Sequence, residues 1–310
     1  MLSHLATQLL VAFNITGPIL LILSLGLVFR RIGLLNEEFV RIGNKLVFNV
    51  TLPCLLFLST ATRPIQQSLN APLVLFAAAC TVGAVVLLWL LAPLFVDRDR
   101  RGVFTQSAFR GNMGIVGLAL CVNAYGDQIL AKAGVYMALM TILYNLLATL
   151  ILAKDKTKGI LSIWQNPLII GVCLGLGWST LSLPLPEFVE QSGRYFAQMT
   201  LPLALLCIGA SLRWQSFKTN SKDVMWATGF KLVVVPALVT LLAIWQGYRD
   251  EDLGVFFLMM AAPTAVAAFV MARQMTPHGH LAAESVALST ALSPFTVTAG
   301  LLLLGLANLI

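Results

Sequence analysis

The stretch that decides the fold is Phe104-Thr-Gln-Ser-Ala-Phe-Arg110-Gly-Asn-Met-Gly114-Ile-Val-Gly-Leu-Ala-Leu120. It reads as a membrane span, but its middle carries an arginine, an amide and three glycines spaced by three residues. Glycine is a poor helix former, and polar side chains at the middle of a bilayer are costly. Non-helical backbone at that depth is tolerated only where protein buries it or where it lines a wet cavity. We therefore predict that residues 110–114 are the unwound point of a broken membrane helix.

The composition of the whole chain is that of a polytopic membrane protein. Hydrophobic residues make up 58% of the 310 residues and charged residues 11%, against about a quarter in soluble domains. The net charge of +7 comes mainly from short loops between apolar runs, so it indicates membrane topology rather than a nucleic-acid partner. The five cysteines are scattered singly, without a Cys/His cluster. We expect no disulfide, no metal and no other cofactor.

Ten apolar segments are long enough to cross a hydrocarbon core about 30 Å thick. They comprise residues 6–29, 38–60, 70–95, 103–124, 129–153, 166–183, 195–212, 224–246, 253–273 and 281–308. Fourteen Lys and Arg residues lie in the odd-numbered loops and four in the even-numbered loops, while Arg110 and Lys231 lie within spans. The positive-inside rule then places the odd loops in the cytoplasm. We expect a multi-pass protein of the inner or plasma membrane, with both termini on the non-cytoplasmic side.

The chain also contains an internal repeat. A shift of 149 residues, without a gap, superposes Thr51-Leu-Pro53 on Thr200-Leu-Pro202, together with further matches on both sides. Each half holds five spans, an odd number, so the second half enters the membrane from the opposite side. Such inverted repeats are typical of secondary transporters, whose substrate sites lie near the midplane where discontinuous helices meet. The two five-helix halves are residues 1–153 and 166–310, joined by a short cytoplasmic linker at 154–165.

The same shift predicts a second break. Met113-Gly114 corresponds to Ala262-Pro263 in the ninth span, where proline cannot donate the helical hydrogen bond. We expect the fourth and ninth spans to be broken at equivalent points and to cross. Asn112 aligns with Ala261, so the amide is unique to the fourth span.

These motifs resemble the auxin efflux carrier family, which includes plant auxin exporters and bacterial permeases for malate, malonate and related acids. The resemblance covers the whole chain and is carried by Arg110-Gly-Asn-Met-Gly-Ile-Val-Gly117, both Thr-Leu-Pro motifs, Ala262-Pro263-Thr264 and Ser289-Thr-Ala-Leu-Ser293. The long central loop of many plant members is absent, which indicates the compact prokaryotic type. The proline that often follows the glycines of span four is replaced here by Leu118-Ala119.

The resemblance implies a fold like that of sodium/proton antiporters and bile-acid symporters. In that fold a scaffold of spans one, two, six and seven lies beside a moving bundle of spans three to five and eight to ten. The scaffold helices are also the surface through which we expect a homodimer.

Two half-helices that begin at the crossing would point backbone N–H groups and positive dipole ends at one cavity. This arrangement binds a small carboxylate without needing a cationic side chain. Asn112 can offer both a donor and an acceptor to such an anion, and the alternative is that it caps the broken helix. The further substrate-binding candidates are residues of the two breaks and polar residues near the scaffold prolines: Gly111, Gly114, Ala262, Pro263, Thr264, Asn49, Gln198, Thr51 and Thr200. For the scaffold residues the alternative is a simple proline bend with threonine satisfying the freed carbonyl.

Two basic residues lie within spans. An unpaired lysine at the midplane costs about 2.5–3.5 kcal/mol, so Lys231 needs an explanation. It either extends to the cytoplasmic surface or stands in for a sodium ion at the crossing, stabilising unwound carbonyls and exchanging a proton. For Arg110 we expect a place at the cytoplasmic vestibule, where it attracts anions. Ser285, Ser289 and Ser293 form a stripe typical of helix packing.

The leading function is therefore a secondary active transporter of small organic anions, such as malate, malonate or auxin-like acids, working by alternating access. An enzyme is not expected, because no span combines an aspartate with a histidine or a glutamate. Two alternatives stay open: a drug/metabolite-type ten-span exporter, and a non-transporting membrane sensor or anion channel. A reporter fused to a terminus separates the first alternative from the leading function, and a counterflow assay separates the second.

Overall fold

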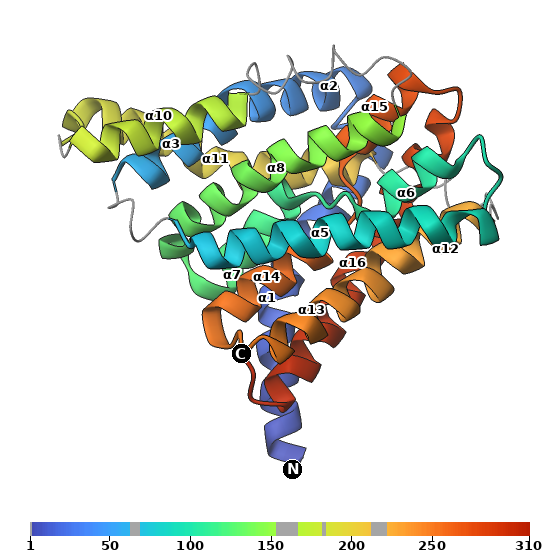
Figure 1. Ribbon diagram of the computed structural model, residues 1–310. Helices are drawn as coiled ribbons and strands as arrows, with labels where there is room; N and C mark the ends of the chain where they lie inside the picture. Colours follow the sequence, from blue (N-terminus) through green and yellow to red (C-terminus); the bar gives the residue numbers. More distant parts are fainter. Residues whose placement is uncertain (1, 63–68, 153–166, 182–183, 212–221) are drawn as a thin grey trace.

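The computed structural model describes residues 2–62, 69–152, 167–181, 184–211 and 222–310, and most of these residues are helical (Figure 1). Within these ranges no β-sheet occurs, only one isolated pairing of two extended segments. Six helical stretches are long and apolar enough to cross a membrane: Ala6–Arg31, Glu37–Ala61, Ala71–Leu94, Asp127–Leu152, Lys222–Trp245 and Gly279–Leu306. The expected class, an all-α polytopic membrane protein, is confirmed. The predicted linker at 154–165 falls outside the described residues.

The helices form two groups that can be recognised by their contacts (Figure 1). In the first group α3 packs along α10, as Figure 1 shows. Both α1 and α2 contact α11. Its members are α1 (Leu2–Arg31), α2 (Glu37–Leu46), α3 (Leu52–Ala61), α10 (Pro167–Leu181) and α11 (Glu187–Ser211).

In the second group α6 packs on α5 and α12, α13 packs on α14, and α15 packs on α16. Its members are α5 (Ala71–Leu91), α6 (Arg101–Phe109), α7 (Leu118–Tyr125), α8 (Leu130–Leu152), α12 (Lys222–Gly229), α13 (Val235–Trp245), α14 (Asp250–Ala261), α15 (Val266–Met275) and α16 (Gly279–Leu306). The two groups touch where α1 lies along α16 and where α3 lies along α8.

Short irregular turns join or interrupt these helices. Two of them, η2 (Ala92–Leu94) and η4 (Asp127–Ile129), are single tight turns at helix ends. Three are wide π-turns within a span: η1 (Val47–Thr51), η3 (Met113–Gly117) and η6 (Phe230–Val234). Two of the wide turns come just before a proline, Pro53 after η1 and Pro236 after η6. Proline lacks an N–H and crowds the preceding turn, which explains why the helix widens there.

Glycines bring two helix pairs of the first group into close backbone contact. A Cβ placed on Gly175 of α10 would lie 2.6 Å from the carbonyl oxygen of Phe57 in α3. A Cβ placed on Gly26 of α1 would collide with the carbonyl oxygen of Leu206 in α11. Only glycine permits these approaches, because it has no side chain to place between the backbones.

The start of the seventh predicted span, at residue 195, is wrong. Helix α11 begins at Glu187, two turns earlier. The early part was missed because it carries Glu190 and Arg194, which lower its hydropathy. These two residues form an ion pair one turn apart, which stabilises the helix despite the loss of apolar character.

Candidate functional site

The predicted breaks in the fourth and ninth spans are both present in the structure. Helix α6 ends at Phe109, the backbone turns extended at Arg110, and helical structure resumes at Met113. Helix α14 ends at Ala261, and α15 begins only at Val266. Gly114 lies inside η3, so the first break covers residues 110–112 rather than 110–114.

The two extended segments are hydrogen-bonded to each other in antiparallel fashion. Asn112 N donates to Pro263 O at 2.6 Å, and Ala265 N donates to Arg110 O at 2.9 Å. Gly111 and Thr264 are the paired residues at the centre of this contact. The backbone groups freed by each break are thus satisfied by the other break, as buried backbone groups require.

The register of this contact differs from the predicted one. Gly111 faces Thr264, a separation of 153 residues, where the flanking repeat has a shift of 149. The pairing is therefore displaced by four residues from the one that a shift of 149 would give. This displacement equals about one helical turn, and α14 with 12 residues is longer than α6 with nine. Residues 262–265 of the second break carry no amide side chain, so Asn112 is the only amide of the two breaks.

Side chains satisfy the helix ends at the crossing. Lys231 Nζ donates to the carbonyl oxygen of Met260 at 2.6 Å, at the C-terminal end of α14. Thr264 Oγ1 donates to the carbonyl oxygen of Ser107 at 2.8 Å, near the C-terminal end of α6. Ser289 Oγ accepts from Thr264 N at 3.0 Å. Thr264 is fully buried, and its hydroxyl serves the structure by satisfying the Ser107 carbonyl.

Lys231 does not extend to the surface. Its side chain is 1% exposed, and a Cβ placed on Gly111 would lie 3.3 Å from its Nζ and 3.3 Å from the carbonyl oxygen of Ala262. In the part of the chain that the structure describes, Lys231 forms no ion pair with a carboxylate. The ammonium group lies against the negative end of a half-helix, where a bound cation would be stabilised. Gly111 is small because this approach leaves little room for a side chain.

Asn112 precedes η3 at its N-terminal end and is 8% exposed. Its side chain makes no hydrogen bond to any described residue, so it does not cap the half-helix. The first N–H groups of any helix lack partners within it. The Asn112 amide therefore lies beside the first backbone N–H groups of η3, which have no acceptor within that helix.

The structure places Arg110 away from an open vestibule, in contrast to the prediction. Its guanidinium is buried, with the residue 5% exposed. One terminal nitrogen donates to the sulfur of Met271 on α15 at 2.9 Å, and the other donates to Asn145 Oδ1 on α8. The charge is thus enclosed by the second helix group.

The polar scaffold candidates differ in their surroundings. Asn49 is exposed, and its amide donates to the carbonyl of Lys45 one turn back. Thr200 is buried, and its hydroxyl donates to the carbonyl of Phe196, one turn back on the same helix. Thr51 is buried as well, but its hydroxyl has no partner among the described residues.

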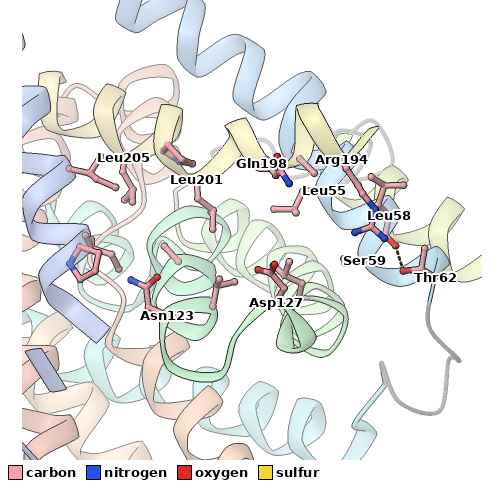
Figure 2. A pocket seen from close by; sticks show the side chains of 18 of the residues that line it. Leu55, Leu58, Ser59, Thr62, Asn123, Asp127, Arg194, Gln198, Leu201 and Leu205 are labelled. Carbon is pink, nitrogen blue, oxygen red and sulfur yellow. Dashed lines mark hydrogen bonds between the residues drawn. The ribbon is translucent and has the colours of Figure 1, made fainter. Parts of the chain in front are cut away.

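Gln198 instead lines a separate pocket of about 440 Å³ between the two helix groups. Figure 2 shows Gln198 and Arg194 of α11 on one side of this pocket and Asn123 and Asp127 on the other. Asn112 and Thr264 do not line it. The sequence analysis named Gln198 but not Arg194, although these two residues lie four positions apart on one helix and share a face.

Comparison with known proteins identifies the family. A family model described as a membrane transport protein matches residues 13–157 and 149–300. The chain belongs to this family. It is the auxin efflux carrier family that the sequence motifs resemble, and the protein is accordingly a membrane transporter and not an enzyme.

Several relatives align over nearly the whole chain. An uncharacterised transporter of Methanocaldococcus jannaschii is 25% identical over 303 residues, covering 92% of this chain and 96% of the relative. The uncharacterised transporter YfdV of Escherichia coli is 23% identical over 301 residues, covering 92% and 94%. A Rhizobium meliloti protein named "Putative malonate transporter" is 25% identical over 275 residues, covering 84% and 85%.

Proposed function

We propose that the protein is a secondary carrier of small organic anions, and that the anion binds where the two broken helices meet. The observation that carries the proposal is Asn112, a buried residue at the start of a half-helix whose amide has no hydrogen-bond partner among the described residues. Helix starts attract anions, and an amide adds both a donor and an acceptor. Lys231 and Arg110 make the surroundings positive, and within the described ranges neither pairs with a carboxylate.

We further propose a ten-span inverted repeat, an arrangement that many secondary transporters share. The six long spans, α10, α11 and the half-helix pairs α6/α7 and α14/α15 provide ten crossings. With a shift of 149 residues, Gly26 in the first half corresponds to Gly175 in the second, and Phe57 corresponds to Leu206. The close contact of Gly26 with Leu206 therefore has the contact of Gly175 with Phe57 as its repeat equivalent. Equivalent close approaches at equivalent positions support two copies of one unit, residues 1–153 and 166–310.

The two helix groups correspond to the two parts of such a carrier. The first group, α1, α2, α3, α10 and α11, is the scaffold of spans one, two, six and seven. The second group holds the remaining spans and carries both breaks, so it is the moving bundle. Transport would proceed by a rigid-body displacement of this bundle past the scaffold, which exposes the anion to one side and then to the other.

The pocket fits one stage of this cycle. It lies between scaffold and bundle and is lined by Thr62, Asp127 and Glu190, which belong to spans near the even-numbered loops. Those loops are the non-cytoplasmic ones if the positive-inside rule holds. We infer that the structure is the state in which the even-loop side is open.

A pair of cysteines tests this cycle. Ser59 lines the pocket, and its repeat mate Ile208 is 4% exposed. In a background without the five native cysteines, Ser59→Cys should react with a membrane-impermeant maleimide from the non-cytoplasmic side. Ile208→Cys should be protected at rest and become reactive from the cytoplasmic side during transport. Equal reactivity of both positions from the same side would contradict alternating access.

Asn112 tests the binding site itself. A ligand at 100 times its Kd stabilises the folded state by about 2.7 kcal/mol, so purified wild-type protein should melt at a higher temperature with the correct acid present. A panel of malonate, malate and indole-3-acetate covers the expected classes, with malonate first because of the relative that carries its name. The shift should vanish in Asn112→Ala and persist in Asn44→Ala, an amide on α2. A full shift in Asn112→Ala would remove Asn112 from the site.

A further inference from the structure

The buried guanidinium of Arg110 lacks a partner that suits its charge. Its hydrogen bonds within the described structure go to the sulfur of Met271 and the amide oxygen of Asn145, and the side chain of Tyr144 lies close by. A thioether is a weak acceptor, whereas a guanidinium carries five donors that match a carboxylate. Buried charges in proteins are normally paired, and intramembrane ones usually mark function.

The surroundings of Arg110 do not supply the missing partner. Gln106, one turn earlier on α6, directs its amide nitrogen to the same sulfur at 3.8 Å. Its Oε1 is buried and has no hydrogen-bond partner among the described residues. The carbonyl near the end of α6 that is freed by the break, that of Ser107, is taken by Thr264. Arg110 occupies the C-cap position of α6 through its backbone N–H, but its side chain neither caps that helix nor forms an ion pair within the described residues.

The backbone places Arg110 on the same side as Asn112. Side chains alternate along an extended segment, and Gly111 turns its side-chain position toward Lys231 Nζ and the carbonyl of Ala262. By this alternation, the side chains of Arg110 and Asn112 leave the segment on the face opposite to Lys231.

We propose that Arg110 is a second anion contact of the transport site, which binds an acidic group of the substrate together with Asn112. Met271 and Asn145 hold the guanidinium when the substrate is absent, and the substrate carboxylate replaces the sulfur when it binds. Substrate affinity is then set by competition between a carboxylate and a thioether for the same donors. The inference rests on the proposed carrier function and deepens it, because it assigns a charged contact to the bound anion.

Binding measurements on the purified full-length protein test this role. The probe is malonate, with uncharged malonamide as its control, and affinity is measured by isothermal titration calorimetry. Arg110→Gln should weaken malonate binding by about 10- to 100-fold, since it removes a charge-assisted hydrogen bond. Met271→Leu keeps the volume but removes the competing sulfur, so it should strengthen malonate binding several-fold. Arg98→Gln, a change in an exposed loop, should leave the affinity unchanged.

The outcomes separate this inference from the proposed function. If wild-type protein binds neither malonate nor the other acids of the panel, the proposed function and the role of Arg110 are both rejected. If wild-type protein binds malonate and a folded Arg110→Gln variant binds it equally well, only the role of Arg110 is rejected. Should Arg110→Gln fail to fold, Met271→Leu decides alone, and unchanged or weaker binding in that variant overturns the proposal.

Discussion

Replacing Lys231 with glutamine is expected to reduce transport by about 100-fold while leaving the protein expressed and folded. The ammonium of Lys231 holds the Met260 carbonyl at the end of α14 and lies beside Gly111. A charge-assisted hydrogen bond contributes about 1.5–3 kcal/mol, and each 1.4 kcal/mol is a factor of ten. Glutamine keeps a donor but loses the positive charge that faces the negative end of the half-helix. The measurement is the initial rate of uptake into proteoliposomes.

Lys222→Gln is the matched control for this variant. Lys222 is an exposed lysine at the start of α12, nine residues before Lys231 on the same span. It should transport at the wild-type rate. Normal uptake by Lys231→Gln would show that the buried charge is not needed, and the role of Lys231 as a stand-in for a coupling cation would be abandoned.

The second large effect concerns stability. Gly26→Ala and Gly175→Ala should each lower the free energy of unfolding by about 1–3 kcal/mol, the usual cost of forcing extra volume into a packed interface. The new Cβ would meet the Leu206 carbonyl in the first variant and the Phe57 carbonyl in the second. On Gly175 the new Cβ would also meet Thr60 Oγ1, but both carbonyl oxygens are backbone atoms, so the helices themselves would have to separate. Thermal unfolding in detergent measures the change.

Gly177→Ala is the control, because it lies on the same helix as Gly175 and a Cβ there would meet nothing within 4 Å. Alanine is the better helix former by about 1 kcal/mol, so this variant should be as stable as wild type or more so. If the contacts are related by the repeat, Gly26→Ala and Gly175→Ala should cost similar amounts. If neither Gly26→Ala nor Gly175→Ala changed the free energy of unfolding, these close backbone approaches would not be what holds the helices together.

The breaks could be predicted from sequence because their chemistry is local. Three glycines and an amide within an apolar run, and a proline within another, are unfavourable in a continuous span. The repeat then linked the two breaks, since identical residues recur at one shift over long helices. Local signals of this kind locate an interruption to within one turn.

The contacts at the crossing could not be predicted in the same way. A shift without gaps cannot reveal that α14 is one turn longer than α6, so the pairing of Gly111 with Thr264 was missed. The partners of Lys231 and Arg110 depend on how helices distant in sequence pack, and neither Met260 nor Met271 carries a polar side chain that would mark it. Arg194 and Asp127 were overlooked because charges near span ends also serve as topology signals.

Counterflow shows whether this transporter carries a small organic anion bound at Asn112. Proteoliposomes loaded with unlabelled malonate and diluted into labelled malonate should accumulate the label transiently above equilibrium. Wild-type protein should show this overshoot, and Asn112→Ala should lose it at equal protein content. A flux without overshoot for malonate, malate and indole-3-acetate alike, or an undiminished overshoot in Asn112→Ala, would contradict this prediction.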